Sequence, residues 1–163
     1  MESKEFTITD TLLASKGDRF LNCLIDSLIV YIIWISIGTT IILIADIANN
    51  TALSDRIECM TPIEHCLSFA VVMMLYYLIM ETYFSRTLAK YFTKTIVAMR
   101  NGSKPTTAAI LKRTLCRFIP FEALTFLGSK SRGWHDSFSH TYVVKRHKFI
   151  EKKQLYAAPL EML

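Results

Sequence analysis

Hydrophobic residues form two long runs along the 163-residue chain, each bounded by polar segments. In the first run, from Phe20 to Ala45, Asp26 is the one charged residue, and positions 27–45 carry no charge at all. Since a helix rises about 1.5 Å per residue, this run is long enough to cross a hydrocarbon core of ~30 Å. A cleaved signal peptide is the rival interpretation, but the run is longer than a signal sequence needs and lacks a clear small-x-small cleavage site. The pattern predicts a first membrane-spanning helix over residues 20–45.

The second run covers residues 66–85, and Glu81 is its one charged residue. Aromatic residues gather at its second end, as is typical of a membrane-interface belt. The segment between the runs, residues 46–65, holds a single basic residue, Arg56, against four acidic ones. Lys and Arg are frequent after the second run, and positive charge favours the cytoplasmic side. We therefore expect a second spanning helix over 66–85 and both termini in the cytoplasm.

A third apolar segment, residues 107–128, also contains basic residues and a proline near its middle. On a helix, Lys112, Arg113 and Arg117 share one face and apolar side chains occupy the opposite face. This pattern favours an amphipathic interfacial or re-entrant helix. A third crossing is the alternative, but it would place the basic tail, residues 129–163, outside, against the charge rule.

Residues 93–100 are rich in β-branched side chains and precede the turn signal Asn-Gly-Ser-Lys-Pro. This order predicts a short cytoplasmic β-hairpin, with residues 141–145 as a second partner strand. The expected fold is thus an all-α membrane protein with two transmembrane helices, an interfacial or re-entrant segment and a small hairpin, in a single domain over residues 1–163.

Composition agrees with this assignment, because 52% of the residues are hydrophobic, above the ~45–50% of soluble domains. The net charge of +5 is unevenly divided: residues 1–84 carry 4 Lys and Arg against 10 Asp and Glu, and residues 85–163 carry 15 against 4. Beside hydrophobic spans, a basic half favours contact with the anionic inner leaflet of a bilayer over binding to nucleic acid. We therefore expect the lipid bilayer as a partner and no nucleic acid.

Ionisable residues inside a span are costly, so they indicate either function or specific packing. Arg19, Asn22 and Asp26 share one helical face at i, i+3 and i+7, and Tyr77 and Glu81 share a face of the second helix. The five side chains are expected to meet in the inner leaflet. Two interpretations stay open: the carboxylates bind or relay a cation while Arg19 tunes their protonation, or the cluster fixes helix packing.

Near the end of the chain, Trp134, His135 and Asp136 precede His140. Asp136 and His140 are four residues apart, but no third strong ligand accompanies them, so no metal site is expected. Asp136 is instead expected to cap a turn or to pair with Arg113 or Arg117. The sequence contains no GxSxG, HExxH or P-loop motif, and we expect neither an enzyme nor a cofactor.

Two cysteines, Cys59 and Cys66, lie in or beside the predicted outer segment. They would form a disulfide only in an oxidising compartment, and free thiols are the alternative. The absence of a Cys-x-x-Cys pair from the sequence argues against structural zinc.

Taken together, these residues resemble the RDD family of integral membrane proteins, named for one arginine and two aspartates. Arg19 resembles the family arginine, Asp26 the first aspartate and Asp136 the second. The stretches 81–84, 87–90 and 111–121 also resemble the family, so the likeness covers nearly all of residues 12–146. One departure is Ala89, where the family usually has glycine before the lysine.

The resemblance implies a bacterial cytoplasmic-membrane protein. Some members are proposed as cation/proton exchangers and others as regulatory or assembly partners of membrane proteases. The chain is accordingly expected to be a small ion-coupled transporter that acts as an oligomer, because two spans cannot enclose a pathway, or else a non-enzymatic scaffold or regulatory subunit of a membrane complex. The candidate site comprises the motif residues and their polar neighbours: Arg19, Asp26 and Asp136, supported by Asn22, Tyr77, Glu81, Arg113, Arg117 and His135.

Overall fold

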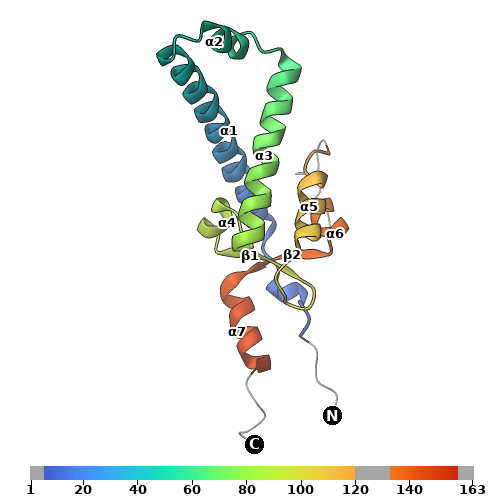
Figure 1. Cartoon of the computed structure of the whole chain (residues 1–163). Coiled ribbons are helices and arrows are strands. Elements are labelled where there is room, and N and C mark those ends of the chain that lie inside the picture. Colours follow the sequence, from blue (N-terminus) through green and yellow to red (C-terminus); the bar gives the residue numbers. More distant parts are fainter. Residues whose placement is uncertain (1–5, 120–132, 158–163) are drawn as a thin grey trace, which may run out of the picture.

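Two long helices dominate the computed structural model, which describes residues 6–119 and 133–157. They are α1 (Lys16–Ile47) and α3 (Pro62–Phe84), and the short helix α2 (Thr51–Glu58) crosses between them at one end (Figure 1). Both long helices have the length and composition to cross a membrane. The chain is therefore a mostly helical membrane protein with the two expected spans. Below, the "α2 end" and the "sheet end" denote the two ends of this helix pair.

Local capping determines where these helices begin. Ser15 and Asp18 form a capping box at the start of α1, and Thr61 and Glu64 form another at the start of α3, where Pro62 occupies the first turn. Such boxes satisfy backbone N–H groups that have no partner inside the helix. At 32 residues α1 is about 48 Å long, so it extends past a ~30 Å hydrocarbon core and begins four residues before the first apolar run.

The two long helices contact each other mainly toward the sheet end. Val30 packs there against Tyr76 and Tyr77, and partly buried aliphatic and aromatic residues surround this cluster. Toward the α2 end the helices diverge (Figure 1). In the most apolar 18-residue stretch of each helix, only 11% is buried within the chain. Most of this apolar surface therefore faces outward.

A two-stranded antiparallel sheet lies at the opposite end from α2. Its strands are β1 (Thr95–Met99) and β2 (Thr141–Lys145), paired with Val97 opposite Val143. Both predicted strand segments are confirmed, but the local hairpin is wrong. A turn does close after β1, where the Gly102 N–H donates to the Met99 carbonyl at 2.9 Å. Thr106 then caps a new helix, so the chain leaves the sheet and its partner strand follows about forty residues later.

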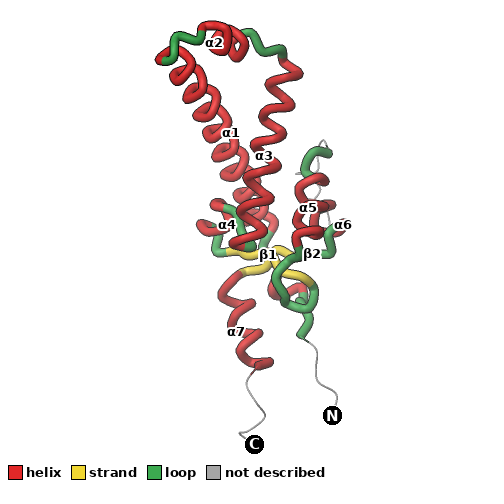
Figure 2. Tube along the Cα trace, viewed as in Figure 1, coloured by secondary structure: helices red, strands yellow, loops and turns green. Residues whose placement is uncertain are grey.

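Short helices surround the sheet end of the long pair (Figure 2). Helix α4 (Leu88–Phe92) follows α3, while α5 (Thr107–Cys116) and α6 (Trp134–Phe138) pack together beside α3. The 3-10 helix η1 (Asp10–Leu12) and α7 (Arg146–Ala157) lie on the other side of the strands (Figure 1). Between them is a second small core, formed by Leu12, Ala98, Val144 and Phe149.

Helix α5 occupies the first part of the predicted amphipathic segment. Its ten residues span only ~15 Å, which is too short to cross a bilayer. Leu111 and Leu115 are exposed, as an interfacial helix requires, but Arg113 is fully buried, so the basic face does not point uniformly to water. The rest of the segment, residues 120–128, and parts of the predicted tail, residues 129–132 and 158–163, lie outside the described residues. Cys59 and Cys66 are exposed free thiols.

Candidate functional site

Three polar residues on one face of α1 each contact a different part of the sheet end. Arg19, Asn22 and Asp26 are only 5%, 5% and 2% exposed, and Val30 continues the same buried face. Seven residues separate Arg19 from Asp26, which is about 10 Å along the helix axis. Since these side chains lie at different positions along the axis of α1, they contact different neighbours.

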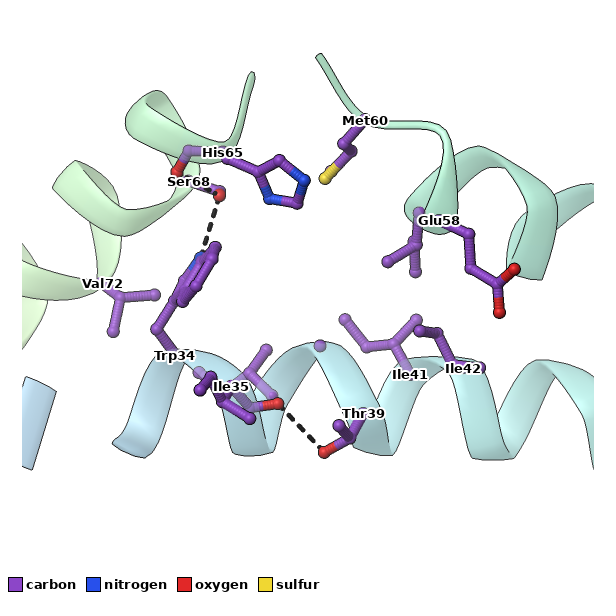
Figure 3. A pocket seen from close by; sticks show the side chains of 13 residues that line it. Trp34, Ile35, Thr39, Ile41, Ile42, Glu58, Met60, His65, Ser68 and Val72 are labelled. Atoms are coloured by element: carbon purple, nitrogen blue, oxygen red, sulfur yellow. Dashed lines mark hydrogen bonds between the residues drawn. The ribbon is translucent and has the colours of Figure 1, made fainter. Parts of the chain in front are cut away.

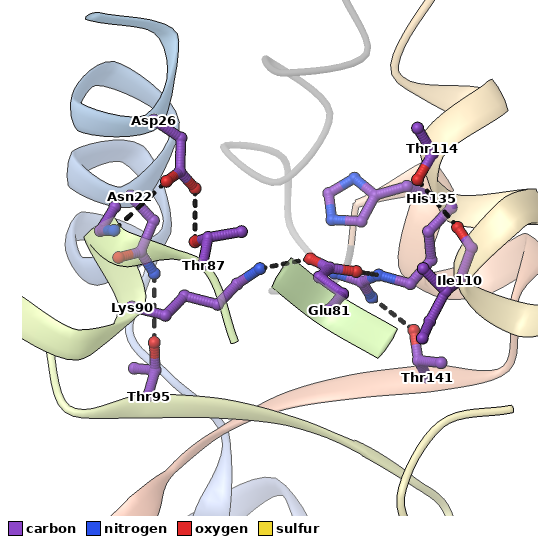
Figure 4. Close-up of polar contacts among 12 residues, drawn as sticks. Asn22, Asp26, Glu81, Thr87, Lys90, Thr95, Ile110, Thr114, His135 and Thr141 are labelled. Carbon is purple, nitrogen blue, oxygen red and sulfur yellow. Dashed lines mark hydrogen bonds and ion pairs between the residues drawn. The ribbon is translucent and has the colours of Figure 1, made fainter. Parts of the chain in front are cut away.

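Asp26 holds the beginning of α4 against α1. Its carboxylate accepts hydrogen bonds from the Tyr76 hydroxyl at 2.7 Å, the Thr87 hydroxyl at 2.6 Å and the Ala89 N–H at 3.2 Å (Figure 4 shows Asp26 facing Thr87). Thr87 precedes α4 but caps none of its N–H groups, so the aspartate of another helix supplies the cap. Ala89 is completely buried within α4, so this position selects for a small side chain.

Asn22 joins the same face of α1 to the start of β1. Its amide donates to the Thr95 hydroxyl at 3.2 Å (Figure 4). Its carbonyl accepts from the Thr93 hydroxyl at 2.7 Å. Both polar ends of the buried amide are therefore satisfied, as burial demands. These two hydrogen bonds fix the position of the start of β1 along the axis of α1.

Glu81 is the centre of a buried group of charges that comes from α3, α4 and α5. One carboxylate oxygen lies 2.6 Å from the Lys90 ammonium, and the other accepts from Arg113 Nε at 3.0 Å (Figure 4). Arg117 approaches Glu81 at 3.5 Å and also covers the ring of Tyr77, with its guanidinium carbon 4.0 Å from the ring centroid. Glu81 is 0% exposed, so its charge is balanced entirely within the protein.

Arg113 extends this group to Asp136 at the start of α6. Besides its bond to Glu81, Arg113 donates through Nη1 to Asp136 and to the Thr141 hydroxyl at the start of β2. Arg19 pairs with the other carboxylate oxygen of Asp136. A planar guanidinium suits this bridging role because its nitrogens point toward several acceptors at once. The result is a continuous ion-pair chain: Lys90, Glu81, Arg113, Asp136 and Arg19.

Burial and neighbouring charges compete in setting the acidity of these groups. Burial alone would raise the pKa of Asp136, but the charges of His135, Arg113 and Arg19 hold it well below its ordinary value. His135 Nε2 lies 3.4 Å from the Asp136 carboxylate. Burial lowers the pKa of the Lys90 ammonium, and Glu81 opposes this effect only in part. Asp136 is therefore held as a carboxylate by its cationic neighbours.

The predicted site thus divides into two adjacent polar clusters. One surrounds Asp26, and the other is the ion-pair chain from Lys90 to Arg19. Arg19 pairs with Asp136 rather than lying beside Asp26, and the tyrosine that donates to Asp26 is Tyr76, whereas the ring of Tyr77 lies under Arg117. The expected pairing of Asp136 with Arg113 is present, whereas Arg117 approaches Glu81. Sequence reasoning did not select several contributors: Tyr76, Thr87, Lys90, Thr95 and Thr141. The stretch 87–90, noted only for its likeness to the family, was the available signal for Thr87 and Lys90.

Within residues 6–119 and 133–157, no three His, Cys, Asp or Glu side chains are grouped so that they would hold a metal ion. His140 is exposed and adopts a left-handed backbone conformation, with φ of 52°, where α6 ends and β2 begins. The contacts described for this site are ion pairs and hydrogen bonds among its own side chains.

The sequence also matches the model of a known protein family. The model of the RDD family matches residues 13–141, which is 129 of the 163 residues. The matched range contains both clusters, from Arg19 to Thr141. Searches of curated proteins and of solved structures find no match.

Replacement of Arg113 by lysine tests the bridging role. We expect Arg113→Lys to lower the free energy of unfolding by about 3 kcal/mol, because one ammonium cannot bond Glu81, Asp136 and Thr141 together and a buried carboxylate loses a partner. Unfolding in mixed micelles would measure this loss. Arg56→Lys is the matched control, since Arg56 pairs with Glu64 at the surface and should show no measurable change. Equal stability of the two variants would contradict the assignment.

The depressed pKa of Asp136 predicts a loss of stability in acid. As the pH falls below about 4, the unfolded chain takes up a proton at this position before the folded chain does, so the stabilising contribution of the carboxylate declines. Above about pH 5 the contribution is complete and constant. We therefore expect the stability difference between wild type and Asp136→Asn to shrink as the pH falls from about 5 to 3. A difference that is constant over this range would show that Asp136 carries no depressed pKa.

Proposed function

Because the chain belongs to the RDD family of integral membrane proteins, we propose that it is a non-enzymatic scaffold or regulatory subunit of a complex in the bacterial cytoplasmic membrane. We further propose that the sheet end faces the cytoplasm, with both termini on that side. Support comes from charge: Arg86, Lys90, Lys94 and Arg100 follow α3 at the sheet end, whereas residues 46–65 at the α2 end contain one basic residue.

The observation that carries this proposal is the saturation of the buried carboxylates. Glu81 and Asp136 are each 0% exposed and each is bound by more than one cationic side chain of the same chain. Such a network holds α3, α4, α5 and α6 in one arrangement and leaves these acids committed to structural partners. A rigid base of this kind suits a subunit that presents fixed surfaces to other proteins.

Exposed apolar and basic side chains lie around that base. Leu111 and Leu115 on α5, and Trp134 and Phe138 on α6, are 41% to 62% exposed, which suits contact with lipid at the membrane interface. Arg146 and Lys148 on α7 are also exposed, beyond the sheet. In this proposal the apolar side chains lie in the inner leaflet, and the basic ones face anionic headgroups or a partner protein.

Mild-detergent extraction from native membranes tests the subunit role. We expect the tagged chain to be recovered with a foreign subunit in fixed stoichiometry, read out as the intact mass of the complex. Mixing the tagged membranes with isotope-labelled membranes before extraction controls for association after lysis, because a partner acquired then would carry the label. Recovery solely as a homo-oligomer would refute the scaffold role.

Asp26 favours a second function, ion-coupled transport by an oligomer. Among the described residues, no Lys or Arg forms an ion pair with this carboxylate, which is 2% exposed within a spanning helix and is bonded only to hydroxyl and amide groups. A buried acid without a fixed counter-charge suits proton or cation exchange. Two spans per chain require several copies to enclose a pathway.

Flux through proteoliposomes tests this second function. If Asp26 carries the ion, Asp26→Asn should reduce proton-coupled cation flux by about tenfold or more, because the amide carries no exchangeable charge. Asp18→Asn is the control, since Asp18 lies in the first turn of the same helix and caps it near the surface. Flux that is the same in wild type and Asp26→Asn would eliminate this function.

A further inference from the structure

The divergence of the long helices leaves an apolar cavity at the α2 end. Trp34 still joins the two helices, since its indole N–H donates to the Ser68 hydroxyl at 3.0 Å. Beyond this contact lies a cavity of about 360 Å³ between α1 and α3 (Figure 3), which Ile57 and Met60 line from the α2 side. This cavity is distant from both polar clusters, and the proposed function makes no use of it.

The lining indicates an occupant that is apolar along most of its length. Ile35, Ile41, Ile42 and Val72 form the walls. His65 also lines the cavity, its ring faces Met60 in Figure 3, and its Nδ1 is buried without a hydrogen-bond partner among the described residues. An unpaired buried nitrogen is unfavourable by about 1–3 kcal/mol, so a polar group of the occupant would be stabilised beside it. The combination fits an amphiphile.

Gly38 gives independent evidence that space is kept free on α1. It lines the cavity, and a Cβ placed on it would have no atom within 4 Å other than its chain neighbours and the adjoining backbone of its own helix. Glycine inside a helix is about 1 kcal/mol less favourable than alanine, and no described neighbour approaches closely enough to require it. The space above Gly38 is therefore available to a molecule that is not part of this chain.

The cavity is large enough for a slender apolar chain. Its volume of about 360 Å³ is more than twice the ~150 Å³ that accommodates benzene in an apolar protein interior. If the cavity were empty, the side chains that line it would lose dispersion contacts. We propose that this cavity binds one acyl chain of a membrane lipid, whose polar group reaches His65.

Native mass spectrometry of the full-length protein with a lysophospholipid that carries a single palmitoyl chain tests this proposal. Wild type should bind one lipid per chain. Gly38→Leu should weaken binding by about tenfold, because the leucine fills the cavity. It should also retain its fold, since the new side chain enters open space and the helix loses a glycine, and a thermal melt verifies this.

Ser36→Leu provides the matched control, because Ser36 is exposed on the same helix and does not line the cavity. This variant should bind lipid as wild type does. His65→Phe keeps a ring beside Trp34 but removes Nδ1, so it should also weaken binding. Equal lipid binding by wild type and Gly38→Leu would overturn the proposal. Unchanged lipid binding together with loss of a dimer mass in Gly38→Leu would overturn it in favour of a contact between copies.

Discussion

The bridge that Arg113 forms between Glu81 and Asp136 is the interaction on which the sheet end of this protein depends. Glu81 ends a spanning helix, Asp136 lies in a short helix far along the chain, and Arg113 reaches both. A buried ion pair adds little net stability compared with apolar packing, but the loss of one partner is severe. The bridge therefore works chiefly by excluding other arrangements: once its elements are assembled, any displacement leaves a charge unpaired in a dry environment.

Asp26 solves a related problem with hydrogen bonds. Where a spanning helix gives way to irregular backbone near a membrane surface, exposed N–H groups need partners that lipid cannot supply. Asp26 supplies one to Ala89, and the Tyr76 hydroxyl accepts from the Leu88 N–H at 3.2 Å. The backbone of α4 is thus completed by side chains from both spanning helices. This arrangement explains why an acidic residue is useful in α1 whether or not it also carries an ion.

Sequence reasoning recovered the features that are local and failed for those that depend on distant partners. The two spans follow from long apolar runs with one charged residue each, and the buried face of Arg19, Asn22 and Asp26 follows from helical periodicity. Their partners do not, because 117 residues separate Arg19 from Asp136 and no spacing rule relates them. Choosing between Tyr76 and Tyr77 would have required the helix rotation to within ~100°, which a helix that is apolar all round does not reveal.

The two ends of the helix pair differ in what a movement would break. At the sheet end, any shift of α5 or α6 separates several fully buried charges together. At the α2 end, the polar contacts include the hydrogen bonds from Trp34 to Ser68 and from Ser54 to Asp46, and the surface pair of Arg56 with Glu64, which contributes little to stability. Opening or narrowing the apolar cavity there disturbs no buried ion pair among the described residues. The sheet end is therefore suited to hold a fixed geometry, whereas the α2 end is suited to adapt to what lies between the helices.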